Sequence, residues 1–316
     1  MKAWTIPTHG TLSILKQGTQ QKPTCGDDEV LVRVHAAALN PADLKLVSGK
    51  EGGHLLHAQN FPITPGFDYS GTIEEKGAHV RDLKVDQDVF GFLPYARSTK
   101  QGSLCAYLSV KPEHVSPKPS NVTHAAAAAA GTTGSTALQG LRDKGRLTKG
   151  QDVLVNGASG GVGTYAVQIA HHAGAQVFGT CSKKNMAMVK ALGAREVFDY
   201  KETKVAEMDR QFDIIFDAAS NLSFHQCTRQ LKRGGVYITL LPSVSLATGI
   251  IRSLFSSKAS RFVIVTPKSN DLAQLASWLS SEDITSCIDT IYPFDQADKA
   301  FQHLSQGVAG KIVVSV

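Results

Sequence analysis

The fold of this chain is decided at residues 153–163, which read Val153-Leu154-Val155-Asn156-Gly157-Ala158-Ser159-Gly160-Gly161-Val162-Gly163. A short apolar run precedes a glycine-dense turn, and an apolar-periodic run follows it, so we expect a strand, a tight turn and a helix. Backbone N–H groups at such a helix start favour an anion, and glycine lets a pyrophosphate approach the backbone closely. The stretch therefore predicts a dinucleotide site, with a plain tight turn as the alternative. Its candidate residues are Gly157, Ser159, Gly160, Gly161, Val162 and Gly163.

The next apolar run, Gln176 to Thr180, fits the second strand of a βαβ unit, whose end selects the cofactor. An acidic residue there would bond the ribose 2′-hydroxyl of NAD, but the chain continues with Cys181 and then Ser182, Lys183 and Lys184. A hydroxyl and two ammonium groups suit a 2′-phosphate, which carries nearly two negative charges. These three residues therefore predict NADPH rather than NADH. The alternative is a solvated helix start with Ser182 as its N-cap.

Length and composition indicate a globular protein of two domains. The chain has 316 residues, of which 42% are hydrophobic and 19% are charged, so it can bury a large core. Its net charge of +6 is scattered, without an aromatic and basic stripe, so we expect no nucleic-acid partner. The five cysteines form no C-x-x-C pair, which fits a reducing compartment, and we expect a cytoplasmic protein. We expect no signal peptide and no integral membrane segment, because no long apolar run occurs.

The pattern of elements changes near residue 125. Up to that point the sequence reads mainly as short strands and turns, whereas afterwards helices and strands alternate, which predicts a parallel sheet with helices on both faces. We therefore expect an α/β fold with domains at residues 1–125 and 126–266, and a return to the first domain at 267–316. The strands expected in the second domain are Val153–Val155, Gln176–Gly179, Glu196–Asp199, Ile214–Asp217, Val236–Leu240 and Phe262–Val265.

Ordered motifs along essentially the whole chain resemble one family. They are the stretches 37–43, 65–71, 134–138, 153–163, 192–200, 239–242, 265–268 and 310–314. With them the chain resembles the medium-chain dehydrogenase/reductase superfamily in its zinc-free quinone oxidoreductase branch, and within it the chloroplast-envelope quinone oxidoreductase homologues and alkenal/alkenone reductases. The resemblance implies a GroES-like β-barrel domain made from both chain ends, an inserted Rossmann domain with a doubly wound parallel sheet, and a homodimer that pairs Rossmann sheet edges.

The resemblance also bears on metal binding. Zinc-dependent relatives place a cysteine where this chain has Asn40, and Gly-His-Glu where it has Gly66-Phe67-Asp68; they also carry four closely spaced cysteines that this chain lacks. Zinc needs three or four converging ligands, so we expect no metal. Without a Lewis acid, alcohol oxidation is disfavoured. Hydride transfer to a substrate that is activated by its own conjugation needs less help.

Three residues are candidates for the catalytic site: Asn40, Asp43 and Lys45. Asn40 replaces the metal ligand and could donate from its amide to an enolate oxygen, or it could simply cap the turn at Pro41. We expect Asp43 to orient the local backbone and Lys45 rather than to act as a base. Lys45 could stabilise an enolate or a cofactor phosphate, and a solvated lysine is the alternative.

By resemblance, three further residues join the cofactor site: Thr136, Tyr200 and Lys311. Thr136 would bond the nicotinamide or its phosphate, and Tyr200 would line the 2′-phosphate site unless it merely packs on the sheet. Lys311 could reach the cofactor or be a charge at the sheet edge. The loop from Leu46 to Phe61 is long enough to act as a substrate lid.

The sequence thus predicts an NADPH-dependent, metal-independent reductase that transfers hydride to a quinone or to the C=C bond of an α,β-unsaturated carbonyl. An NADPH-binding interaction or sensory protein with little catalysis is the alternative. The segment 246–262 combines apolar and basic residues and has two interpretations. We expect a helix that covers the domain or a dimer interface, and peripheral contact with an anionic membrane is the alternative.

Overall fold

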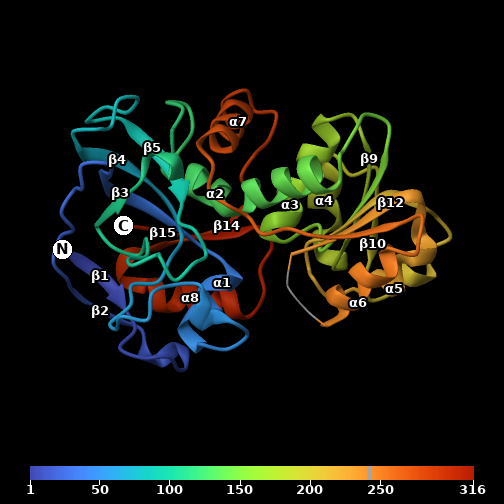
Figure 1. Cartoon of the computed structure of the whole chain (residues 1–316), viewed down its shortest axis with the longest axis horizontal. Helices are drawn as coiled ribbons and strands as arrows, with labels where there is room; N and C mark the ends of the chain where they lie inside the picture. Colours follow the sequence, from blue (N-terminus) through green and yellow to red (C-terminus); the bar gives the residue numbers. More distant parts are fainter. Residues whose placement is uncertain (241–243) are drawn as a thin grey trace. The chain divides into compact units, whose positions relative to one another are not determined.

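The computed structural model describes residues 1–240 and 244–316, and its contacts divide the chain into two compact units (Figure 1). The first unit comprises residues 1–135 and 266–316, and the second comprises residues 136–265. The first unit is therefore made from both ends of the chain. The domain boundaries at 125/126 and 266/267 stay predictions. Of the family motif at 239–242, residues 241 and 242 lie outside the described part of the chain.

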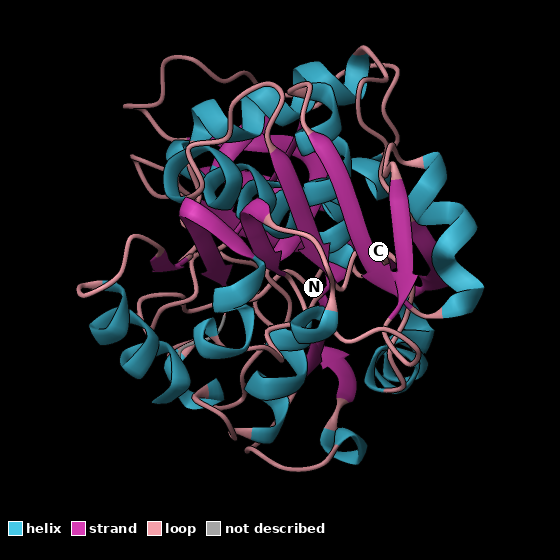
Figure 2. Ribbon diagram, turned by 90° about the vertical axis from the view of Figure 1, so that its right-hand side faces the viewer, coloured by secondary structure: helices cyan, strands magenta, loops and turns pink. Residues whose placement is uncertain are grey.

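The described part of the second unit contains a six-stranded parallel sheet in the order β10-β9-β8-β11-β12-β13. The order reverses direction beside β8, so right-handed crossovers place the helices on both faces, as the alternating pattern predicts. Figure 2 shows the strands of the chain in magenta and its helices in cyan, with the right-hand side of Figure 1 facing the viewer. The strands are β8 (Asp152–Asn156), β9 (Gln176–Cys181), β10 (Glu196–Asp199), β11 (Phe212–Asp217), β12 (Leu231–Thr239) and β13 (Ala259–Phe262).

The helices of the second unit follow the same two-sided plan. In Figure 1 α3 and α4 lie on one side of the strands, and α5 and α6 lie on the other. Residues 163–170 of α3 are all buried, because this helix packs against β8 and β9. The helices are α3 (Gly161–His172), α4 (Met186–Ala191), α5 (Phe224–Cys227) and α6 (Val244–Ser253).

Two expected strands differ from those observed by three residues or more at one end at least. The strand expected at Phe262–Val265 ends at Phe262, because the residues that pair with β12 are Ala259–Phe262. β12 starts five residues before the expected Val236, since Leu231 already pairs with Phe212 of β11. In both cases backbone pairing, rather than the apolar run, sets the end of the strand.

The first unit holds a seven-stranded sheet in the order β14-β15-β3-β4-β5-β7, with β6 also paired to β3, over the described residues. All its pairs are antiparallel except β14 with β15, and a separate pair joins β1 to β2. The strands are β1 (Lys2–Thr5), β2 (Lys16–Thr19), β3 (Val30–Leu39), β4 (Asp68–Lys76), β5 (Asp88–Phe92), β6 (Tyr107–Val110), β7 (Val115–Pro117), β14 (Ile288–Pro293) and β15 (Lys311–Ser315).

Four α-helices are described in the first unit or start there. The β-rich pattern of the first 124 residues does not predict the helix α1. Its first residue is Pro41, and Gly49, in a left-handed conformation, follows its last residue. The alanine-rich α2 begins in this unit and its last residues fall in the second. No helix of the described chain is long and apolar enough to cross a membrane. The helices are α1 (Pro41–Ser48), α2 (His124–Gln139), α7 (Ser269–Ser280) and α8 (Ala297–Ser305).

Candidate functional site

A buried polar cluster lies in the first unit where β3 ends and α1 begins. Asn40 stands directly before the helix in an extended conformation, and Pro41 starts the helix without needing an N–H partner. The backbone N–H of Asn40 donates to the Asp43 carboxylate at 2.7 Å, and the N–H of Gly66 donates to the other oxygen at 2.9 Å. Asp43 thus fixes the helix start against the chain that enters β4.

Burial shifts the protonation of this carboxyl group. Asp43 is fully buried, and the loss of solvation raises its pKa to about 7, against the opposing effects of the two N–H donors and of Lys311. The neighbouring Asp68 carboxylate raises the pKa as well. Asp43 therefore changes charge near neutral pH while it holds two backbone groups.

Lys311 and Asp68 form the charged centre of the cluster. Lys311 is the first residue of β15, and its Nζ lies 2.6 Å from Asn40 Oδ1, 2.7 Å from the Leu39 carbonyl and 3.1 Å from Asp68 Oδ2. Both charged residues are buried, at 3% and 0% exposure. The three hydrogen bonds use the three N–H groups of the ammonium, so it is fully committed to protein acceptors. The assignment of Lys311 to the cofactor stays a prediction.

The Asp68 carboxylate accepts four hydrogen bonds, which compensate for its burial. Besides Lys311, Asn40 Nδ2 donates to Oδ2 at 2.9 Å. The backbone N–H and the hydroxyl of Thr132, in α2, donate to Oδ1 at 2.7 and 2.5 Å. Next to this group Tyr95 packs edge-on against Phe67, with ring centroids 4.5 Å apart. Burial raises the pKa of the Tyr95 phenol well above its ordinary value, and Asp68 and Asp43 raise it further.

Lys45 does not join the cluster. Its ammonium lies 3.0 Å from the Glu51 carboxylate, which is largely exposed. The expected orientation of Lys45 by Asp43 is not seen, because both Asp43 oxygens accept backbone N–H groups. The proposed lid from Leu46 to Phe61 starts inside α1, and its role stays a prediction.

The atoms at the metal-ligand positions of zinc-dependent relatives are already engaged. Asn40 Oδ1 and Asp68 Oδ2 both accept from Lys311, and Phe67 offers no ligand atom. Within residues 1–240 and 244–316, no three His, Cys, Asp or Glu side chains form a group that could hold a metal ion. The residues at this place do not fit zinc, which requires three or four converging ligands.

The glycine turn of the second unit joins β8 to α3. Gly157 adopts a φ of +79°, which side chains rarely tolerate, and Gly160 stands directly before the helix. A Cβ atom at Gly163 would lie 2.1 Å from the Gly157 carbonyl oxygen, so the helix packs closely on the turn. At Gly160 a Cβ would meet only that same oxygen, at 3.5 Å. The protein leaves this point of the turn open, as a site for an anion at a helix N-terminus requires.

A buried hydrogen-bond network at the strand ends holds the glycine turn in place. Thr180 Oγ1 donates to Asn156 Oδ1 at 2.6 Å and accepts the N–H of Gly157 at 3.2 Å. Asn156 Nδ2 donates in turn to the fully buried Asp217 at 2.7 Å. The Tyr237 hydroxyl donates to the same carboxylate at 2.9 Å. These residues lie at the carboxyl ends of neighbouring strands, which is where ligands bind in such sheets.

The residues predicted to select the cofactor lie together in the second unit. Lys183 and Lys184 are exposed just beyond β9, and neither ammonium has a partner among the described residues. The backbone N–H of Tyr200 donates to the Cys181 carbonyl at 3.1 Å, which places Tyr200 beside the same strand end. Asn185 Nδ2 donates to Ser159 Oγ at 3.2 Å and links this corner to the glycine turn.

Other candidate residues have simpler positions. Ser182 precedes a short 3-10 helix but its side chain does not cap it. Val162 is half-buried in the first turn of α3, and Thr136 is buried near the end of α2. The roles of all three stay predictions.

Sequence reasoning missed the roles of Asp68, Thr132 and Thr180. In the sequence Asp68 stands out only as a replaced ligand position, and Thr132 lies 64 residues from its partner Asp68. One signal for such residues is a polar side chain inside an apolar strand, as at Asn156 and Asp217. A buried polar group needs a hydrogen-bond partner, so a second polar residue such as Thr180 is expected nearby.

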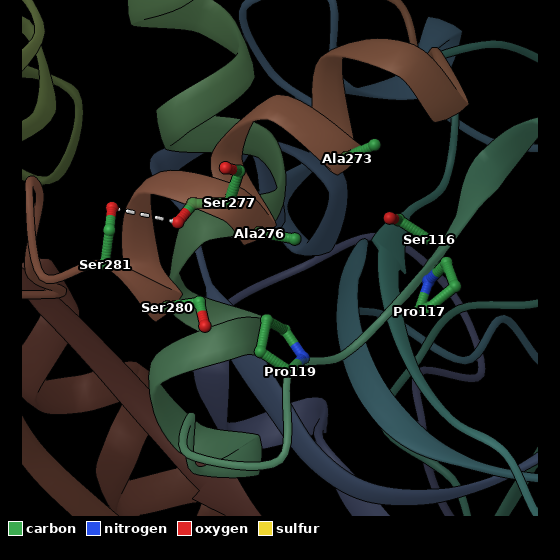
Figure 3. A pocket seen from close by; sticks show the side chains of 8 residues that line it. All are labelled: Ser116, Pro117, Pro119, Ala273, Ala276, Ser277, Ser280 and Ser281. Atoms are coloured by element: carbon green, nitrogen blue, oxygen red, sulfur yellow. Dashed lines mark hydrogen bonds between the residues drawn. The ribbon is translucent and has the colours of Figure 1, made fainter.

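A groove of about 580 Å³ on the first unit lies apart from these residues (Figure 3). The Ser281 hydroxyl at its rim donates to the Ser277 carbonyl at 3.1 Å. The side chains that line the groove are small and uncharged, so they provide no charged group that could bind the phosphates of a nucleotide. They belong to Ser116, Pro117, Pro119, Ala273, Ala276, Ser277, Ser280 and Ser281.

Two family descriptions match the chain. Residues 26–120 match "Alcohol dehydrogenase GroES-like domain", and residues 192–314 match "Zinc-binding dehydrogenase". The second description concerns the family, whereas the donor atoms in this chain do not fit zinc.

Curated relatives and solved structures agree with these matches. The chain is 32% identical to a 2-methylene-furan-3-one reductase of Solanum lycopersicum, over 99% of this chain and 79% of that protein. It is 30% identical to the NADPH-dependent alkenal/one oxidoreductase of Arabidopsis thaliana, chloroplastic, over the same shares of each chain. The structure of the quinone oxidoreductase from Coxiella burnetii superimposes with a TM-score of 0.91 at 28% identity, covering 100% of this chain and 99% of that one. The α/β architecture is therefore a GroES-like domain plus a Rossmann-like domain, and the chain belongs to the medium-chain dehydrogenase/reductase superfamily, in its quinone oxidoreductase-like branch.

Proposed function

We propose that this protein is an NADPH-dependent reductase that delivers hydride to a quinone or to the C=C bond of an α,β-unsaturated carbonyl, without a metal ion. The observation that carries the proposal is the Lys311 ammonium, which binds the oxygens of Asn40 and Asp68 that would otherwise be free for a cation. A substrate reduced here must be electrophilic by its own conjugation, because no Lewis acid activates it. The names of the tomato and Arabidopsis relatives, a 2-methylene-furan-3-one reductase and an alkenal/one oxidoreductase, support this class.

NADPH is favoured over NADH by the charges beyond β9. Lys183 and Lys184 are exposed and unpaired within the described residues, and the backbone of Tyr200 is hydrogen-bonded to Cys181 at the strand end that precedes them. Their ammonium groups would hold the 2′-phosphate, while the N–H groups at the start of α3 would hold the pyrophosphate. When bound, the cofactor supplies the hydride. Asn40 donates an amide N–H to the oxygen on which negative charge develops.

The proposal is tested by following NADPH and NADH oxidation with 1,2-naphthoquinone and with a short alkenone. We expect turnover with both acceptors, a preference for NADPH of about tenfold, or roughly 1.4 kcal/mol, and no loss after exhaustive chelation. Saturated alcohols with NADP⁺ should give no turnover. Replacing both lysines, Lys183→Met with Lys184→Met, should remove the preference for NADPH.

Three results would contradict the proposal in different ways. Activity that disappears on chelation would show a metal enzyme, and clear alcohol oxidation would show another reaction. Tight NADPH binding without turnover on any acceptor would favour the alternative, a cofactor-binding interaction or sensory protein.

A further inference from the structure

The orientation of the Asn40 side-chain amide is fixed by its two charged neighbours. Lys311 can only donate hydrogen bonds, so the amide oxygen of Asn40 must face it, at 2.6 Å. The Asp68 carboxylate accepts, so the amide nitrogen must face it, at 2.9 Å. If the amide were flipped, N–H would face ammonium and oxygen would face carboxylate. An amide at this place therefore has one stable orientation.

This arrangement leaves one N–H group of Asn40 for a ligand. The amide nitrogen carries two hydrogens, and one of them is used by Asp68. The second has no acceptor among the described residues, although Asn40 is only 3% exposed. A buried donor without an acceptor is destabilising, and this cost is relieved when a ligand oxygen accepts the hydrogen bond.

We propose that Lys311 and Asp68 are positioning residues, which hold the Asn40 amide so that its second N–H points to the carbonyl oxygen of the substrate. The inference rests on the proposed reductase function and extends it. Lys311 does not touch the substrate, since all three of its N–H groups are used. Its ammonium holds the side chains of Asn40 and Asp68 in place by hydrogen bonds. In zinc-dependent relatives a metal ion binds the side chains at these positions.

The matched control for removing Lys311 is Lys118. Its side chain is 5% exposed, its Nζ donates to the carbonyls of Val122 at 2.7 Å and Pro119 at 3.1 Å, and it lies 3.5 Å from Asp88. Lys118→Met and Lys311→Met therefore both remove a buried ammonium with three acceptors from the first unit. Only Lys311 contacts the Asn40 amide.

The test is a double-mutant cycle on kcat with NADPH and a quinone. Asn40→Ala should lower kcat on the order of a hundredfold, as loss of one donor to an oxyanion does. Lys311→Met should lower kcat by about tenfold or more with the Kd for NADPH unchanged, because the amide is no longer held in place. Adding Lys311→Met to Asn40→Ala should cause little further loss, because Lys311 acts through Asn40. Lys118→Met should leave kcat within about twofold of wild type.

Stability is separated from positioning by a second pair of changes. Lys311→Met alone leaves the Asp68 charge buried and unpaired, which destabilises the fold, and adding Asp68→Asn removes that charge. We expect the double variant to regain the wild-type Tm while kcat stays low. If the losses of kcat in Asn40→Ala and Lys311→Met multiplied in the double variant, the inference would be overturned. Recovery of both the Tm and the wild-type kcat in Lys311→Met with Asp68→Asn would overturn it as well. Absence of turnover in the wild-type protein would instead overturn the proposed function.

Discussion

Gly160 and Gly163, at the start of α3, respond differently to an added side chain. At Gly163 an added Cβ would lie 2.1 Å from the Gly157 carbonyl oxygen, so the backbone would have to move. At Gly160 the same atom would be 3.5 Å away, an ordinary contact. A branched side chain at Gly160 therefore protrudes where the pyrophosphate is expected, while the fold has room for it.

We expect Gly160→Val to weaken NADPH binding at least about tenfold with a Tm close to that of wild type, because the branched side chain blocks the approach of the phosphates. Gly160→Ala should have a smaller effect, and Gly163→Val should lower the Tm. Fluorescence titration of NADPH together with thermal unfolding checks all three variants. Undiminished binding by a folded Gly160→Val protein would place the phosphate site elsewhere.

Local patterns single out the candidate residues of the second unit, whereas they do not reveal the buried cluster of the first. The glycine turn follows the first strand of a βαβ unit, and Lys183 and Lys184 follow the second strand, so local patterns name both groups as candidates. The first-unit cluster joins Asp68 and Lys311, which lie 243 residues apart. No local pattern could reveal that Lys311 meets Asn40 and Asp68, because the contact exists only once β15 has paired with β3.

At the scale of elements, the start of α2 joins β3 and β5 through a pair of histidines. His124, the first residue of α2, has its Nδ1 2.8 Å from Ser70 Oγ and its Nε2 3.5 Å from Asp88. Its ring centroid lies 4.6 Å from that of His35 in β3. Burial lowers the pKa of His124 to about 4 and also lowers the pKa of His35, and Lys118 acts in the same direction while Asp88 opposes it.

This histidine should make the fold sensitive to acid. The unfolded chain binds a proton on His124 near its ordinary pKa of about 6.5, whereas the folded chain binds it only near 4, so stability is lost as pH falls between these values. Relative to wild type, His124→Gln should reduce the stability difference between pH 7 and pH 5 by about 1–2 kcal/mol. Urea denaturation at the two pH values measures this. His225→Gln, at an exposed position, should leave the difference unchanged; an equal effect there would refute the assignment to His124.

Element boundaries were predicted where periodicity and tertiary pairing agree. α3 (Gly161–His172) closely matches the apolar period that predicted it. The helix α1 was not predicted, because a β-rich context surrounds it and its start depends on Asp43 holding Asn40 and Gly66. The position of β13 depends on its register with β12, which the apolar run at 262–265 does not encode.

At the scale of the whole molecule, the second unit exposes an apolar patch formed by Ile250, Ile251, Leu254 and Phe255. The last two side chains are 75% and 89% exposed, and β13 forms the edge of the sheet close to them in sequence. Exposed patches of this kind mark interaction surfaces, and an unpaired strand edge invites a partner. The homodimer implied by the family resemblance would cover both features.

We expect the wild-type protein to sediment as a dimer and Phe255→Glu with Leu254→Glu to shift it to monomer, because burying two carboxylates in the interface is costly. Analytical ultracentrifugation at several concentrations measures the shift. Leu55→Glu, in the first unit, should leave the dimer intact. A dimer that persists in the double variant would exclude this patch as the interface. Loss of binding to vesicles of anionic phospholipid in that variant would favour membrane contact instead.

The pairing of Lys311 with Asp68 also has a consequence for the order in which the two units fold during synthesis on the ribosome. The second unit is one continuous stretch, residues 136–265, whereas the first unit needs both ends. Domains fold as units during synthesis, normally from the N-terminus onward. Here the second unit can complete its folding before the first. Asn40 and Asp68 gain their contacts with Lys311 only after residue 311 has been synthesised. During that interval the nascent protein carries an organised glycine turn and, in the first unit, an Asp68 carboxylate that lacks its counter-ion.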